Sequence, residues 1–134
     1  MYPSVAGLVV AVFSAEWPTI RFCTELPSNV EGMLPVVQVN RFGGSDDTVT
    51  MDRAYIDVDV WHGSLTAAED LASELHTWMV LRMPGKWATV GAAGPGVVAS
   101  CRAQTGMYQR PSGNPDLFRV GGAYTVRAHS FRPS

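Results

Sequence analysis

Asp57 and Asp59 are the side chains of this sequence whose type and spacing best suit chemistry. They lie two residues apart in an alternating polar and apolar segment. On an extended strand, such residues share one face at a separation of about 6.5–7 Å. Two carboxylates at that separation can act as acid and base or hold a cation. A small metal-dependent hydrolase that uses Asp57, Asp59 and His62 is therefore one possible function.

A structural role for the two aspartates is the plainer interpretation, and we favour it. The sequence places no third ligand or orienting group beside them, which an active site would need. They would then form the polar face of a half-buried strand, with Arg41 or a C-terminal arginine opposite as a cross-strand partner. No catalytic residue is predicted.

The remaining histidines and cysteines do not match a known metal or nucleophile pattern. His62, His76 and His129 occur in no HExxH or H-x-H arrangement, so we expect no metal site. Cys23 and Cys101 match no C-x-x-C or zinc spacing. We therefore expect two free, packed thiols, in keeping with a reducing compartment. A nucleophilic cysteine would need a histidine close in space.

The glycine-rich segment Gly91–Gly96 is similar to a phosphate-binding loop only in composition. It leads into a predicted strand instead of a helix, and no Lys-Ser or Lys-Thr pair follows it. We therefore expect no nucleotide and no other cofactor.

The tryptophans are the strongest candidates for packing or contact. Trp78 falls on the apolar stripe of a predicted helix and should lie in the core. Trp61 shares a strand face with Asp57 and Asp59, and aromatic residues mixed with charges are typical of subunit contacts. For Trp61, interface and ordinary packing both stay open.

The composition favours a protein that associates. Charged residues make up 16 % of the 134 residues, against about 25 % in an average soluble domain, and hydrophobic residues make up 46 %. A domain of this size cannot bury so much apolar surface alone, and large exposed apolar patches usually mark interaction sites. No signal peptide is evident, and the longest apolar run, Val5–Phe13, is far shorter than the ~20 residues that span a bilayer. We expect a soluble, intracellular protein without a membrane partner.

The charges are unevenly distributed along the chain. Residues 1–85 contain four basic and eleven acidic residues, a net charge of −7, whereas residues 86–134 contain six basic and one acidic, a net charge of +5. Basic C-terminal strands could pair with acidic central strands inside one fold. Alternatively, the acidic face of one copy could meet the basic face of the next, and such head-to-tail contacts can close into rings.

The pattern along the chain predicts a single α+β domain over residues 1–134. Ser4 should cap a helix that ends near Ala15, and a second helix should begin with Thr66 and Glu69 as a capping box and end before Pro84-Gly85. Alternation predicts strands at 19–26, 35–42, 53–62, 97–107 and 118–130. A long acidic loop should join the second and third strands, from Gly43 to Asp52. The expected fold is thus a mixed, mainly antiparallel sheet of about five strands with two packed helices, in the order α-β-β-β-α-β-β.

The order of these segments resembles the tail terminator (tail-tube capping) proteins of long-tailed phages, particularly phages that infect actinobacteria. The similarity covers about three-quarters of the chain and fades after Gly85. The residues that carry it are Tyr2-Pro3-Ser4-Val5, Leu8-Val9-Val10, Thr24-Glu25-Leu26-Pro27, Leu34-Pro35-Val36-Val37-Gln38-Val39, Arg41-Phe42-Gly43-Gly44, and Asp52 leading into Ile56-Asp57-Val58-Asp59-Val60-Trp61.

The resemblance implies a structural virion protein without a cofactor. Six copies would form a ring that caps the head-proximal end of the tail tube, ends tube polymerisation and offers a docking surface to the head connector, while DNA passes through the lumen without specific binding. It implies a location in the neck region of the virion, and in the host cytoplasm during assembly. A head-side neck or head-closure protein is the alternative within the same class.

We expect the contacts with neighbouring subunits or the tube to involve seven charged or aromatic residues, of which Asp57 and Asp59 are also candidates to face the lumen, where acidic groups would repel DNA. These residues are Arg41, Asp46, Asp47, Arg53, Asp57, Asp59 and Trp61.

Overall fold

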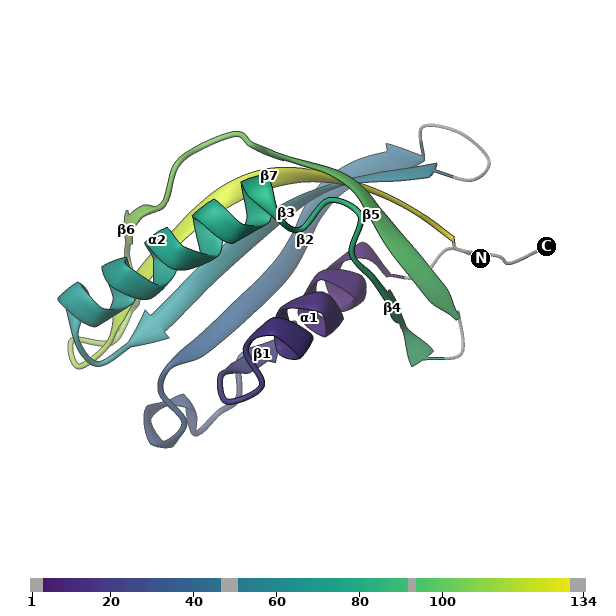
Figure 1. The fold of residues 1–134 in the computed structure, drawn as a ribbon. Helices are drawn as coiled ribbons and strands as arrows, with labels where there is room; N and C mark the ends of the chain where they lie inside the picture. Colours follow the sequence, from purple (N-terminus) through teal and green to yellow (C-terminus); the bar gives the residue numbers. More distant parts are fainter. Residues whose placement is uncertain (1–3, 47–50, 92–93, 131–134) are drawn as a thin grey trace.

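The computed structural model describes residues 4–46, 51–91 and 94–130. Its elements are α1 (Val5–Glu16), β1 (Arg21–Cys23), the 3-10 helix η1 (Val30–Gly32), β2 (Val36–Asp46), β3 (Met51–His62), α2 (Leu65–Leu81), β4 (Trp87–Thr89), β5 (Pro95–Ala103), β6 (Tyr108–Arg110) and β7 (Phe118–Ser130). Figure 1 shows α1 and α2 on the same side of a curved sheet. The predicted α+β class is confirmed.

The strands form one sheet in the order β1-β2-β3-β7-β5-β4, with β6 also paired to β7. β1 runs parallel to β2, and every other described pair is antiparallel. The sheet has seven strands instead of about five. The two strands that were not predicted, β4 and β6, have three residues each, which is too short for an alternating pattern to be recognised. The strand predicted at 19–26 shortens to Arg21–Cys23.

Alternation along β3 decides where the main core lies. Ala54, Ile56, Val58 and Val60 are each fully buried and belong to the cluster that also contains the inner faces of both helices. Burying apolar area in this way is the main favourable term in folding, at about 25 cal/mol per Å². The odd-numbered residues of β3 consequently point to the opposite face of the sheet.

Both helices begin at a serine cap. The Ser4 hydroxyl accepts a hydrogen bond from the Gly7 N–H at 3.1 Å, as predicted for α1. The predicted capping box of α2 is wrong, because Ser64 is the cap: its hydroxyl accepts from the Ala67 N–H at 3.3 Å. Helix α2 therefore begins two residues earlier than predicted, at Leu65, and Thr66 already lies inside its first turn.

The predicted long loop between β2 and β3 is also wrong. The ladder continues through Gly43↔Tyr55 to Asp46↔Asp52, with a register shift after Arg41. Glycine, serine and aspartate usually signal a turn, but here the facing strand supplies their hydrogen-bonding partners. Gly44 adopts φ 113°, and a Cβ there would collide with the backbone of Arg53.

The described ends of the Gly91–Gly96 segment lie between β4 and the start of β5. The Val90 N–H donates to the Gly94 carbonyl at 2.9 Å, and Pro95 and Gly96 already belong to β5. Residues 92 and 93 lie outside the described part of the chain. Among the described residues, no helix has the length and apolarity needed to cross a lipid bilayer.

Candidate functional site

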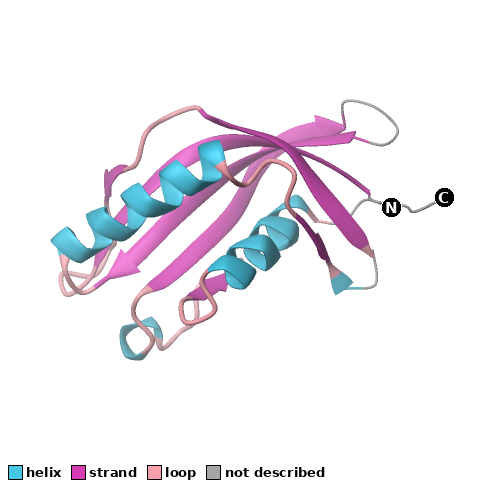
Figure 2. Cartoon of the chain, viewed as in Figure 1, coloured by secondary structure: helices cyan, strands magenta, loops and turns pink. Residues whose placement is uncertain are grey.

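The face of the sheet that is turned away from the helices carries the polar residues singled out in the sequence. Figure 2 shows both helices on one side of the strands, which leaves this second face to loops and side chains. Along β3, the residues of this face follow one another in the order Arg53, Tyr55, Asp57, Asp59 and Trp61. They divide the face into an apolar end, a middle with paired charges and a basic end.

Trp61 forms the apolar end. It is 8 % exposed and packs with Val30, Val36 and Leu117 in a small second cluster. Of the two roles left open for Trp61, ordinary packing is therefore the one that the structure supports.

Asp57 and Asp59 share an arginine in the middle of this face. Arg110 Nη1 lies 3.1 Å from Asp57 Oδ1 and 3.2 Å from Asp59 Oδ1, and Arg119 Nη2 lies 2.9 Å from Asp59 Oδ2. The Asp59 side chain is 2 % exposed and that of Asp57 is 25 % exposed. The C-terminal partner expected for these carboxylates is thus present, in the form of two arginines.

Strand register brings these groups together. Asp59 faces Gly121 on β7, and Gly121 faces Tyr108 on β6. Because Gly121 has no side chain, the Asp59 carboxylate can lie across β7 and reach both arginines; a Cβ at Gly121 would overlap it and would lie 2.8 Å from the Val58 carbonyl oxygen.

Aromatic rings and burial hold the two arginines in place. The Arg119 guanidinium lies 5.4 Å from the Trp61 ring centroid and that of Arg110 lies 5.0 Å from the Tyr108 ring centroid. Burial opposes the charge on Arg110, but the carboxylates of Asp59 and Asp57 outweigh it and raise the pKa of Arg110. The group is a charged network that ties β6 and β7 to β3.

This geometry does not assemble the hydrolase site considered from the sequence. His62 lies on the opposite face of β3 from the aspartates, and its Nδ1 accepts from the Gly63 N–H at 2.9 Å. Among residues 4–46, 51–91 and 94–130, no group of three or more potential metal ligands comes together. Asp59 is enclosed and paired with two arginines within the subunit, and a lumen-facing role of Asp57 and Asp59 stays a prediction.

Arg41 forms a separate ion pair. It follows Val37 and Val39 on the helix-facing side of β2, so it cannot reach Asp57 or Asp59. Its guanidinium instead binds Asp52 through two hydrogen bonds of 2.8 and 3.0 Å. The backbone of Asp46 pairs with that of Asp52, whereas the side chain of Asp46 and all of Asp47 lie outside the described residues.

The basic end of the open face is a shallow depression of about 890 Å³. We call it the basic depression. Three arginines are among the described residues that line it; these residues are Arg53, Tyr55, Ser100, Arg102, Ala103, Gln104, Thr125 and Arg127. Phe42, which is 52 % exposed, stacks on Tyr55 at its edge with ring centroids 6.1 Å apart. Of these residues, only Arg53 was predicted from the sequence to have a functional role. Thr125 and Arg127 alternate with buried residues on β7, and this alternation could have placed both of them on the open face.

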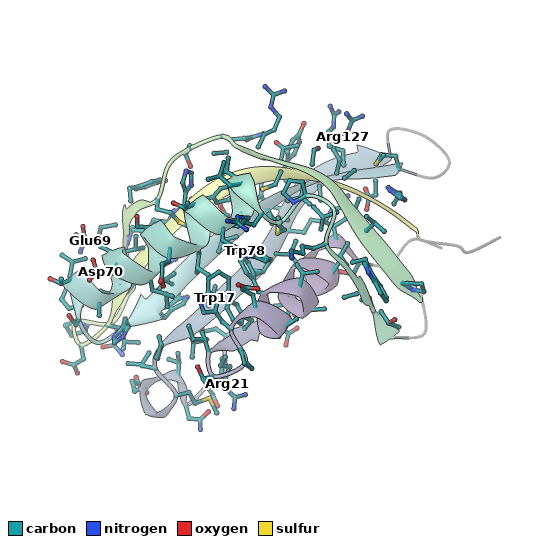
Figure 3. The ribbon with its side chains drawn as sticks, in the orientation of Figure 1. Trp17, Arg21, Glu69, Asp70, Trp78 and Arg127 are labelled. Carbon is teal, nitrogen blue, oxygen red and sulfur yellow. The ribbon has the colours of Figure 1, made fainter. Side chains whose placement is uncertain are left out.

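A second hollow lies between the helices on the opposite side of the molecule. This groove, which we call the helix groove, measures about 1120 Å³ and has Trp17 and Trp78 in its lining, with ring centroids 5.2 Å apart. Exposed carboxylates of Glu16, Asp70 and Glu74 stand along it. Arg82 and Lys86, which follow the C-terminal end of α2 at Leu81, also line it. Figure 3 shows Trp17 and Trp78 between the helices and Asp70 at the outer end of α2.

The two thiols are free, as expected, and lie in the packed part of the structure. Burial raises the pKa of Cys101 to about 12, and burial likewise raises the pKa of Cys23 despite the nearby Arg21 charge. The Tyr124 hydroxyl and His76 Nδ1 form a hydrogen bond of 2.6 Å, and burial raises the pKa of Tyr124. These groups are poorly suited to nucleophilic chemistry, because the reactive thiolate or phenolate is disfavoured.

Comparison with known proteins identifies the family. A comparison with curated proteins gives no match. A family model described as phage tail termination protein matches residues 1–133, which includes both helices, every described strand and the charged network. The match also covers the C-terminal part, where the resemblance seen in the sequence fades. The chain belongs to the phage tail termination protein family and is a structural, tail-related virion protein.

Proposed function

We propose that this protein forms a ring, with six copies as the expected number, that caps the head-proximal end of the tail tube and ends tube polymerisation. The family match over residues 1–133 is the observation that carries this proposal. The low charge content supports association between copies. The function is structural and needs no catalysis or cofactor.

The partners in this proposal are the major tail tube protein below the ring and the head connector or stopper protein above it. The ring would lie in the neck region of the virion after assembly in the host cytoplasm. DNA would pass through its lumen without specific binding. A host among the actinobacteria stays a prediction from the sequence resemblance.

The surface residues in this proposal differ in their availability. Arg53 borders the basic depression and Arg41 is one-third exposed beside Asp52, so both can contribute to contacts. Asp46 and Asp47 stay candidates for contacts as predicted from the sequence. Asp57, Asp59 and Trp61 act within the subunit by holding the open face together.

Removal of the gene from its phage tests the function. We expect free heads together with tubes of uncontrolled length, because nothing would stop tube growth or join it to the head. Addition of the purified chain should cap the tubes at one end in electron micrographs. Finished tails of normal length that fail only to retain DNA in the head would identify a head-closure protein instead.

A further inference from the structure

The helix groove carries charges of both signs in a regular order along α2. We propose that two copies of this chain meet on this groove about a two-fold axis, with their α2 helices antiparallel. A two-fold contact closes after two copies and cannot repeat around a ring. The proposal therefore adds a second contact to the chain and does not rest on the ring.

The charges on the α2 side of the groove are spaced symmetrically about Trp78. Glu74 precedes Trp78 by four residues, and Arg82 follows it by four. Asp70 precedes it by eight residues, and Lys86 follows it by eight. The sign of the charge thus changes from negative to positive at Trp78.

This order of charges makes the groove complementary to itself. In an antiparallel pair of α2 helices with the two-fold axis at Trp78, Glu74 of one copy faces Arg82 of the other, and the reverse pair forms by symmetry. Asp70 and Lys86 form the outer pair in the same way. The outer pair is held less strictly, because Lys86 lies beyond the end of α2 at Leu81. Complementary charges of this kind fix the register of a contact.

The charged groups of the groove are not neutralised within the subunit. All five are exposed, and no ion pair between described residues involves any of them; they are Glu16, Asp70, Glu74, Arg82 and Lys86. Asp70 and Glu74 are four residues apart on one helix, a spacing at which like charges repel. A second copy brings a cation to each of these two carboxylates, so the repulsion is offset by attraction.

The centre of the groove supplies apolar surface for the same contact. Figure 3 shows Trp17 and Trp78 between the helices, and both line the groove. Leu81, three residues from Trp78 on α2, is 70 % exposed and also lines it. A contact centred on Trp78 covers Leu81 of both copies and leaves the charges at its rim, which is the usual arrangement of a protein interface.

A basic partner protein is the competing occupant of the groove. Such a partner would use the carboxylate of Glu16, which α1 contributes, as well as those of Asp70 and Glu74. It would also meet the positive charges of Arg82 and Lys86, which disfavour it. The two-fold contact instead uses both signs of charge, and it has no cation at the spacing that would match Glu16. These observations favour a second copy.

Charge reversal at the inner pair tests the contact. Glu74→Lys alone places two cations together at two sites in each dimer, and Arg82→Glu alone does the same with anions. Each variant should dimerise on the order of 10-fold more weakly than the original chain, because two attractions become repulsions. The chain with both substitutions should recover the original affinity, and so should an equal mixture of the two single variants. Sedimentation velocity over a concentration series measures dimerisation, and circular dichroism confirms folding.

Two further variants serve as controls for these measurements. Glu16→Gln removes the carboxylate that the two-fold contact does not use, so it should not weaken dimerisation. Glu25→Lys reverses an exposed charge outside the groove and should dimerise like the original chain.

Cross-linking tests the symmetry itself, because identical residues approach each other only near a two-fold axis. Thr77 is exposed, lines the groove and is one residue from Trp78. In a Cys23→Ser background, Thr77→Cys should therefore be joined to its counterpart by a short bis-maleimide. Thr66→Cys is the control: it is exposed on the same helix, twelve residues from Trp78, so its two copies would lie about 36 Å apart.

The outcomes separate the alternatives. A chain that forms only monomers or rings, without the Thr77→Cys cross-link, would overturn the two-fold contact and leave the ring proposal intact. Folded single variants that dimerise like the original chain, or a folded double variant that does not recover, would also overturn it. If Glu16→Gln and Glu74→Lys weaken binding to tail tubes while dimerisation is unchanged, the groove belongs to a basic tube protein. Loss of ring formation with the cross-link retained would refute the ring and support the two-fold contact.

Discussion

At the scale of single residues, Asp59 shows how burial changes the contribution of an acidic side chain to stability. Its carboxylate is 2 % exposed and accepts from Arg110 and Arg119, whereas Asp57 on the same face is 25 % exposed and accepts from Arg110. Removal of a buried charge leaves its partners without compensation, which costs much more than loss of an exposed pair. The two aspartates should therefore differ strongly in their contribution to stability.

We expect Asp59→Asn to lower the free energy of unfolding by about 3 kcal/mol, because Arg119 loses the carboxylate that it binds and the buried Arg110 keeps only that of Asp57. The matched variant Asp57→Asn should lower it by about 1 kcal/mol or less. Urea denaturation followed by tryptophan fluorescence measures both. Equal losses in the two variants would contradict the different burial of the two carboxylates.

Gly121→Ala should destabilise the chain by at least about 2 kcal/mol, because the new Cβ would displace the Asp59 carboxylate and press against the Val58 carbonyl. Gly106→Ala is the control, since nothing lies within 4 Å of a Cβ built there. Thermal unfolding of both variants provides the measurement. A Gly121 variant as stable as the control would show that the ion-pair network does not depend on that space.

The thiols should differ in their pH-dependent reactivity. The pKa of Cys101 is raised to about 12 by burial, so its thiolate becomes abundant only near that pH, and alkylation at pH 8 should be very slow. Cys23 is only half-buried and should react first. Peptide mass spectrometry after iodoacetamide treatment distinguishes the two sites, and urea-unfolded protein is the control in which both should react equally.

At the scale of elements, two residues have side chains that could cap α2, and the structure uses Ser64. Ser64 has an extended conformation and caps the helix, although Thr66 and Glu69 match the spacing of a capping box. Both Ser64 and Thr66 therefore have side chains that suit a helix start. Ser64 is the cap because β3 ends at His62 and only a short turn separates His62 from Leu65, the first residue of α2.

Ser64→Ala should lower the free energy of unfolding by about 1 kcal/mol, because the Ala67 N–H loses its hydrogen-bond acceptor. Thr66→Ala should be neutral or slightly stabilising, because alanine has the higher helix propensity. Chemical denaturation compares the two. A larger loss in the Thr66 variant would restore the capping box as the helix start.

At the scale of the whole molecule, part of the separation of charge along the chain is neutralised inside the subunit. Arg110 and Arg119 meet Asp57 and Asp59 across the sheet. Of the two arrangements that the sequence left open, pairing within one copy is therefore present, and head-to-tail contact between copies stays a prediction.

Association between copies should weaken as salt increases. Raising NaCl from 50 to 500 mM shortens the Debye length to a few ångströms and screens the attraction between exposed charges. We expect the mass measured by sedimentation to fall towards that of one subunit, while the fold, followed by circular dichroism, is retained. Association that strengthens with salt would indicate a contact dominated by apolar burial.

The sequence by itself determined the α+β class, the two helices, the three long strands and which face of β3 is apolar, because these follow from local periodicity. It also predicted that Arg41 or a C-terminal arginine lies beside Asp57 and Asp59. Only the tertiary structure decided that Arg110 and Arg119 supply this role and that Arg41 binds Asp52. It also decided that Trp61 packs internally and that Arg53, Arg102 and Arg127 gather in one depression. Strand register sets these pairings. Register brings together residues that are far apart in the chain, and the local sequence around each residue does not identify its partner.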